Sequence, residues 1–217
     1  MPNEIINTLL RGLGERFSLR PLDASPYQKT GGGLLSPVTV LLEAREGDGF
    51  TVSLLEIRAM MGAVRAELLV CTPVLRDAPL ALCGMIHAPG RDSLHLEALD
   101  TLVAPCELSG LAAAVAAHPE SADHPSSLGW YENRKLPVCC CRELGENDPR
   151  ALSLTRDWIR AYTECLAAAA PCGAEEKKRG TEALMAAFLD GGSALKTVYA
   201  LLGEEKAKAL LRKAMMP

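Results

Sequence analysis

The sequence has few aromatic residues and no long apolar run. Phe, Trp and Tyr make up 4% of its 217 residues, which leaves few rings that can stack on a large planar ligand. No segment approaches the roughly 20 consecutive apolar residues that a membrane-spanning helix needs. The first six residues also lack the basic and apolar regions of a signal peptide. We therefore expect a cytoplasmic protein with no membrane partner.

Positive charge is scarce as well. Lys and Arg number 23 against 27 Asp and Glu, which gives a net charge of −4. Nucleic acids bind proteins through a cationic face, so no nucleic-acid partner is expected. The composition of 48% hydrophobic and 23% charged residues is typical of a folded chain with a substantial core. A length of 217 residues favours a single domain spanning residues 1–217.

The common nucleotide and metal motifs are missing. The chain contains no Gly-x-Gly-x-x-Gly, no Walker loop and no His-Glu-x-x-His. None of the eight cysteines forms a Cys-x-x-Cys pair, so the sequence predicts no metal centre. Three cysteines are consecutive, at positions 139 to 141. Adjacent side chains on a strand point to opposite faces and do not pair easily, so we predict free thiols.

Turn signals and apolar spacing divide the chain into three parts. Residues 1–36 contain a helix at 3–16 followed by a loop that includes Gly31, Gly32 and Gly33. Residues 38–142 are mostly sheet, and residues 148–217 are helical. The strands are predicted at 38–45, 50–58, 65–72, 80–87, 93–99 and 136–142. Further helices are predicted at 107–117, 148–170, 174–189, 193–202 and 204–215, and a polar loop at 118–135.

Short turns join the first five of these strands, so the sheet should be antiparallel. The expected fold class is α+β. We predict a three-layer α-β-α sandwich with a central antiparallel sheet and a helical C-terminal third.

Residues 67–100 have an unusual layout. A strand ends at Pro73, a short acidic loop meets Pro79, a hairpin turns on Gly90, and the next strand ends at Asp100. This layout resembles the ferredoxin-dependent bilin reductases and, more distantly, the red chlorophyll catabolite reductases. The tail is also similar to that family, in the run Leu-Leu-Gly-Glu-Glu-Lys-Ala at 201–207.

The resemblance implies a linear tetrapyrrole bound between the sheet and the C-terminal helices. It also implies that no organic cofactor is bound, because in this family the electrons come from ferredoxin. The protein then supplies protons, and this requires an acid that burial and hydrogen bonding keep protonated. The expected partners are therefore a tetrapyrrole-like small molecule and ferredoxin.

Three residues are candidate proton donors on this basis. The strand glutamate of the family aligns best with Glu56, and its later histidine falls near Glu67. Its central aspartate falls on Gly84, which cannot transfer a proton. His87, at the end of the predicted strand 80–87, is the third candidate.

Four further residues are candidates for holding the ligand. Arg65 and Arg142 could receive propionates, because a guanidinium grips a carboxylate with two hydrogen bonds. Trp130 could stack on a pyrrole ring. Cys83 shares a strand face with His87.

Simpler explanations exist for each candidate. Glu56 and Glu67 could form ion pairs with neighbouring arginines, and His87 could be a surface residue before a turn. His95 and Glu97 lie on one strand face and could act as acid and base, although a solvated face fits them equally well. At the level of function, the alternatives are a non-catalytic tetrapyrrole or corrinoid carrier, and an interaction or assembly protein with the same fold.

Overall fold

The computed structural model describes residues 4–22, 27–31, 38–119, 129–145, 148–189, 199 and 202–217. Its strands are β1 (Arg20–Pro21), β2 (Tyr27–Gly31), β3 (Val38–Gly47), β4 (Phe50–Ala59), β5 (Val64–Pro73), β6 (Leu80–Ala88), β7 (Arg91–Leu99) and β8 (Cys140–Leu144). Its α-helices are α1 (Glu4–Gly14), α2 (Ser109–Ala116), α3 (Pro149–Ala168), α4 (Ala174–Leu189) and α6 (Glu204–Met215). Two short 3-10 helices are η1 (Met60–Gly62) and η2 (Gly129–Arg134).

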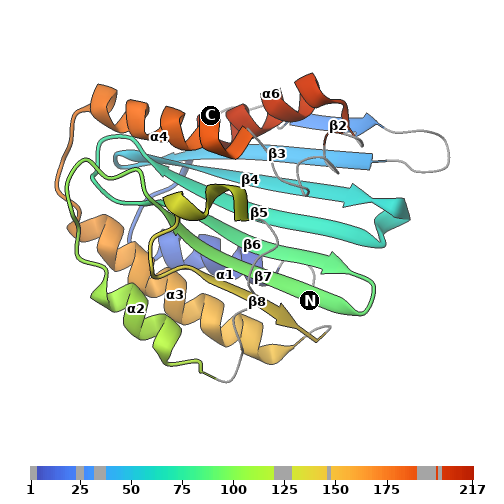
Figure 1. The fold of residues 1–217 in the computed structure, drawn as a ribbon, viewed down its shortest axis with the longest axis horizontal. Helices are drawn as coiled ribbons and strands as arrows, with labels where there is room; N and C mark the ends of the chain where they lie inside the picture. Colours follow the sequence, from blue (N-terminus) through green and yellow to red (C-terminus); the bar gives the residue numbers. More distant parts are fainter. Residues whose placement is uncertain are drawn as a thin grey trace.

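The strands form one sheet between two layers of helices (Figure 1). Their order is β1-β3-β4-β5-β6-β7-β8, and β2 also pairs with β3. Every pairing is antiparallel. Gly49 and Gly90 adopt positive φ angles of 79° and 81° in the tight β3–β4 and β6–β7 turns, a conformation that glycine reaches without strain. The predicted antiparallel sheet and three-layer sandwich are therefore confirmed.

One face of the sheet packs against α1, α2 and α3, and we call it the α1–α3 face. Apolar side chains of the helices interlock there with every second residue of β4 to β8. This core includes the aromatic residues Phe50, Trp158 and Tyr162 as well as Leu69, each at most 2% exposed. Trp158 and Tyr162 stack with ring centroids 5.4 Å apart. This face carries the main core of the molecule.

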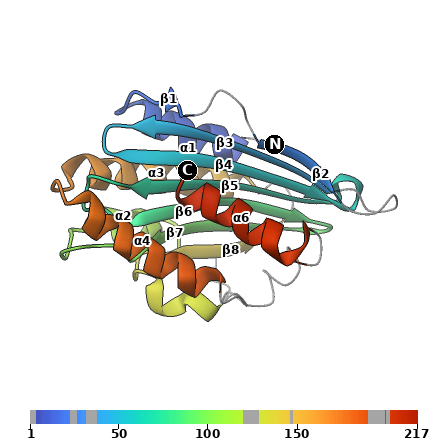
Figure 2. The same ribbon diagram turned by 90° about the horizontal axis from the view of Figure 1, so that it is seen from above.

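The opposite face is covered by α4 and α6, which follow one another across the strands (Figure 2). We call it the α4–α6 face. Two smaller apolar clusters lie here. One contains Leu184 of α4 together with Val70 and Leu82, and the other contains Leu210 of α6 together with Val40.

The structure corrects three predicted boundaries. Part of the predicted N-terminal loop forms β1 and β2, because short edge strands need only backbone pairing with β3 and no apolar alternation. The predicted loop 118–135 contains η2. The strand predicted at 136–142 begins only at Cys140, because Cys139 N–H donates to Leu136 O in a turn. The helix predicted at 193–202 falls almost entirely outside the described residues.

All eight cysteines are free thiols, as predicted. In the described part of the chain, no helix has the length and apolarity that crossing a membrane would require.

Candidate functional site

The two predicted carboxylic acids lie on the α1–α3 face. Glu56 of β4 and Glu67 of β5 are register partners, and Arg65 stands beside both. The Arg65 Nε atom is 3.0 Å from Glu56 Oε1, and the same guanidinium bonds Glu67 Oε1. Arg58 also pairs with Glu56. The simpler explanation, ion pairing with neighbouring arginines, therefore describes both glutamates.

This ion cluster borders an open cavity of about 280 Å³ between α1 and strands β3 to β5. Its lining includes Ile6, Leu10, Leu41, Leu54, Glu56 and Glu67. The cavity therefore has a mixed lining, in which the leucines lie beside charged residues of all three strands.

The other predicted residues with described side chains also lie on the α1–α3 face. His87 Nδ1 is 2.8 Å from Asp92 Oδ1. Cys83 is fully buried in the core, and its thiol pKa is raised by burial. Arg142 is 5% exposed, and its Nε donates to Cys140 Sγ over 3.0 Å. The Trp130 side chain falls outside the described residues.

These positions correct the expected site geometry. The resemblance implies a ligand on the side of the C-terminal helices, but Glu56, Glu67 and His87 point to the other face of the sheet. Gly84 pairs with Leu68, not with Glu67, so it belongs to the α4–α6 face. Glu56 and Gly84, which the family motif matches to its two acids, therefore lie on opposite faces of the sheet. The roles predicted for these residues stay predictions.

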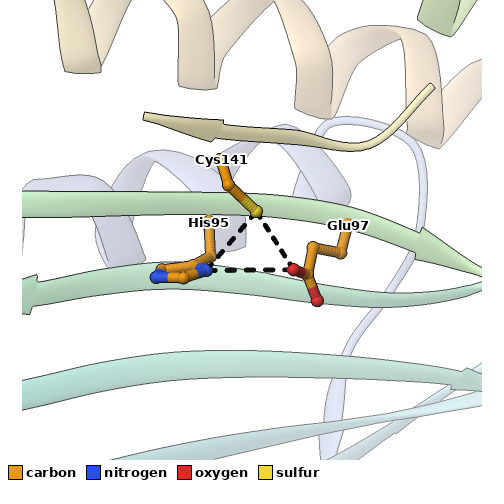
Figure 3. Close-up of side chains that lie close together, drawn as sticks. All are labelled: His95, Glu97 and Cys141. Atoms are coloured by element: carbon orange, nitrogen blue, oxygen red, sulfur yellow. Dashed lines mark hydrogen bonds and ion pairs between the residues drawn. The ribbon is translucent and has the colours of Figure 1, made fainter. Parts of the chain in front are cut away.

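A second group of ionisable side chains lies on the α4–α6 face of the sheet. His95 and Glu97 project from β7, and Cys141 reaches them from β8 (Figure 3). Cys141 Sγ donates to Glu97 Oε1 over 3.1 Å and is 3.6 Å from His95 Nδ1. His95 Nδ1 is 3.8 Å from Glu97 Oε1. His95 is 7% exposed and Glu97 is completely buried, so the solvated-face alternative for this pair is wrong.

Glu97 is ionised despite its burial. Burial raises the pKa of this carboxyl, but His95, the Lys135 charge, the Tyr131 hydroxyl and the Cys141 thiol outweigh burial and hold its pKa at about 2. Tyr131 donates to Glu97 Oε2 over 2.7 Å, and Lys135 Nζ is 3.1 Å from Glu97 Oε1. Burial and the negative charge of Glu97 raise the pKa of the Cys141 thiol, which therefore stays protonated.

His95 has one ring nitrogen outside this group. Figure 3 shows that Nδ1 faces Glu97 and Cys141, whereas the second nitrogen points away from both. Among the residues that the structure describes, Nε2 has no hydrogen-bond partner. A histidine held in this way beside a carboxylate can present an N–H donor to a ligand.

Gly84 is the register neighbour of His95 on β6. A Cβ atom added at Gly84 would overlap the carbonyl oxygen of Glu67 and lie 2.9 Å from Leu68 Cα. The backbone therefore excludes a side chain there. Around Gly84, the α4–α6 face presents three half-buried apolar residues, Ile57, Leu68 and Ile86. We call these three residues the apolar platform.

Sequence reasoning identified His95 and Glu97 as a pair but missed their partners. The alternation of consecutive cysteines places Cys141 on one face and Cys140 on the other, so a β7–β8 pairing could have indicated Cys141. No such signal exists for Tyr131 and Lys135, because they come from η2 and the turn after it.

Comparison with known proteins gives a fold likeness. No protein-family model matches the chain, and no curated protein sequence matches it significantly. Among solved structures, the chain is similar to phytochromobilin synthase from tomato, crystallised as the selenomethionine protein in complex with biliverdin. The TM-score is 0.74, the sequence identity is 12%, and the match covers 99% of this chain and 82% of that one. The resemblance to bilin reductases is thus confirmed in the fold.

Proposed function

We propose that this protein binds a linear tetrapyrrole on the α4–α6 face and reduces it with electrons from ferredoxin. The observation that carries the proposal is a buried His95–Glu97 pair next to Gly84 and the apolar platform, in a fold shared with a biliverdin-bound protein. Flat conjugated ligands bury most of their surface against apolar side chains. Ile86 lies on β6 next to the strand of the acid–base pair. Leu68 and Ile57 continue this apolar surface across β5 and β4, where both also pack against the cluster that includes Leu210 and Ala214 of α6.

His95 takes the part of proton donor in this proposal. Its position beside Gly84 puts an N–H on the same face on which the family motif would place its aspartate. Reduction of one double bond consumes two electrons and two protons. Ferredoxin delivers the electrons one at a time, His95 gives one proton from Nε2, and solvent gives the other. Glu97 is a positioning residue, since its Oε1 lies 3.8 Å from His95 Nδ1 and leaves Nε2 as the ring nitrogen that faces away from the pair.

The experiment is anaerobic turnover of biliverdin with reduced ferredoxin, followed by visible absorption. His95→Gln should still bind biliverdin but reduce it at least about 100-fold more slowly, the usual contribution of a general acid. His118→Gln is the matched control, because His118 pairs with Asp157 in the α2–α3 layer, Nε2 to Oδ2 2.9 Å.

His87→Gln separates this proposal from the role predicted for His87. His87 bonds Asp92 on the α1–α3 face, so its loss should leave turnover unchanged. Wild-type turnover by His95→Gln, or abolished turnover in His87→Gln alone, would contradict the assignment.

A non-catalytic tetrapyrrole carrier is the second candidate. Gly84 favours it, because the family's acid position cannot donate a proton here. Saturable binding of biliverdin without any turnover by the wild type would establish the carrier and exclude the enzyme.

A further inference from the structure

We propose that His95 Nδ1, Glu97 Oε1 and Cys141 Sγ together bind a divalent transition-metal ion of the zinc class. These three atoms come from two neighbouring strands of a rigid sheet, and they converge on one point without a backbone change (Figure 3). The tetrapyrrole proposal uses Nε2 of His95, so the metal site does not depend on it.

The distances fit a tetrahedral centre. Zinc bonds of about 2.3 Å to sulfur and about 2.0–2.1 Å to nitrogen and oxygen set ligand atoms about 3.3–3.6 Å apart. The observed separations are 3.1 Å for Cys141 Sγ to Glu97 Oε1, 3.6 Å for Cys141 Sγ to His95 Nδ1, and 3.8 Å for His95 Nδ1 to Glu97 Oε1. Shifts of a few tenths of an ångström complete the geometry.

The donor set is also selective. A thiolate, an imidazole and a carboxylate suit zinc-class ions, whereas magnesium and calcium prefer oxygen ligands alone. Three protein ligands leave a fourth position for water or another small ligand, as in catalytic rather than structural zinc sites.

Neighbouring side chains orient the carboxylate. Tyr131 holds Glu97 Oε2 over 2.7 Å, which turns Oε1 toward His95 and Cys141. Such outer hydrogen bonds commonly fix the ligands of metal sites. Lys135 competes for Oε1 at 3.1 Å, but it also lies 2.8 Å from Glu132 Oε1 and can remain paired there.

Binding changes the protonation of one group. Glu97 is already a carboxylate, and His95 offers the lone pair of Nδ1 to the metal. The Cys141 thiol loses its proton to solvent as the sulfur–metal bond forms. The thiolate and the carboxylate then balance the two charges of the ion.

The test is a titration of metal-free full-length protein with Co²⁺, then Zn²⁺, without any tetrapyrrole. The expected result is one equivalent of Co²⁺ with a thiolate-to-cobalt charge-transfer band in the near ultraviolet, displaced by one equivalent of Zn²⁺. Cys141→Ser should abolish the band, and His95→Gln should weaken affinity by at least about tenfold. Lys135→Met should tighten binding several-fold, because it removes the competing cation.

Cys139→Ser is the matched control. Cys139 is a neighbouring half-buried thiol whose Sγ bonds the backbone of Ala98, so its loss should keep both the band and the affinity. Absence of saturable one-to-one binding by the wild type, or equal effects of Cys139→Ser and Cys141→Ser, would overturn the proposal. If Cys141→Ser does not fold, the affinity of His95→Gln for Co²⁺ tests the proposal, and wild-type affinity in that variant would overturn it.

Discussion

Gly84 lies where β5 and β6 come too close for a side chain. An added Cβ would overlap the Glu67 carbonyl oxygen, a backbone atom that cannot rotate away. The resemblance to bilin reductases predicts an acid at this position, and the local backbone explains why this chain cannot carry one without rearrangement. His95 is the register partner of Gly84 and is the acid–base residue of the proposed function.

Gly84→Ala should therefore lower the free energy of unfolding by about 1–3 kcal/mol, because the strands must separate to admit the methyl group. Gly145→Ala is the matched control, since an added Cβ there meets no atom within 4 Å. It should change stability by less than about 0.5 kcal/mol. Urea denaturation measures both, and equal stability of the two variants would contradict the close approach at Gly84.

At the scale of elements, one buried lysine fixes α4 to the sheet. Lys177 is 1% exposed, and its three ammonium hydrogens are all used. Nζ donates to Asp77 Oδ1 over 3.2 Å, to Ala78 O over 2.6 Å and to Thr101 O over 2.8 Å. The acceptors belong to the segments that follow β5 and β7. Burial lowers the pKa of Lys177 although Asp77 opposes the shift.

Lys177→Met should destabilise the protein by about 3 kcal/mol, because three buried acceptors lose their donor. Lys178→Met, one residue along on the exposed side of α4, should have little effect. Thermal unfolding compares the two variants directly. Similar melting temperatures for Lys177→Met and the wild type would show that α4 is held by its apolar contacts alone.

The elements themselves were largely predictable, whereas the face that each site residue occupies was not. Alternation and turn residues indicated five strands from Val38 to Leu99, because pleating and hairpin turns leave a local signal. The side of the sheet on which the C-terminal helices pack leaves no such signal. Glu56 and His95 both lie on covered strand faces, but they face different helices. Tyr131 could not be paired with Glu97 because their contact joins η2 to β7.

At the scale of the molecule, the sheet separates two environments. The α1–α3 face holds the main core, with the ion cluster of Glu56, Glu67 and Arg65 at a cavity near its edge. The α4–α6 face holds smaller apolar clusters, the apolar platform and the His95–Glu97 pair. In the proposed function, the tetrapyrrole therefore occupies the α4–α6 face only.

The most direct test titrates three proteins with biliverdin and follows visible absorption. The three are the wild type, a variant altered on the α4–α6 face and a variant altered on the α1–α3 face. Ile86→Gln changes the apolar platform, and Leu41→Gln changes an equally half-buried aliphatic residue that lines the opposite cavity. The account predicts a saturable one-to-one spectral shift that Ile86→Gln weakens by about tenfold, the value of roughly 1.4 kcal/mol of lost apolar contact. Leu41→Gln should bind like the wild type. No saturable shift with the wild type, or a loss of binding confined to Leu41→Gln, would contradict the account.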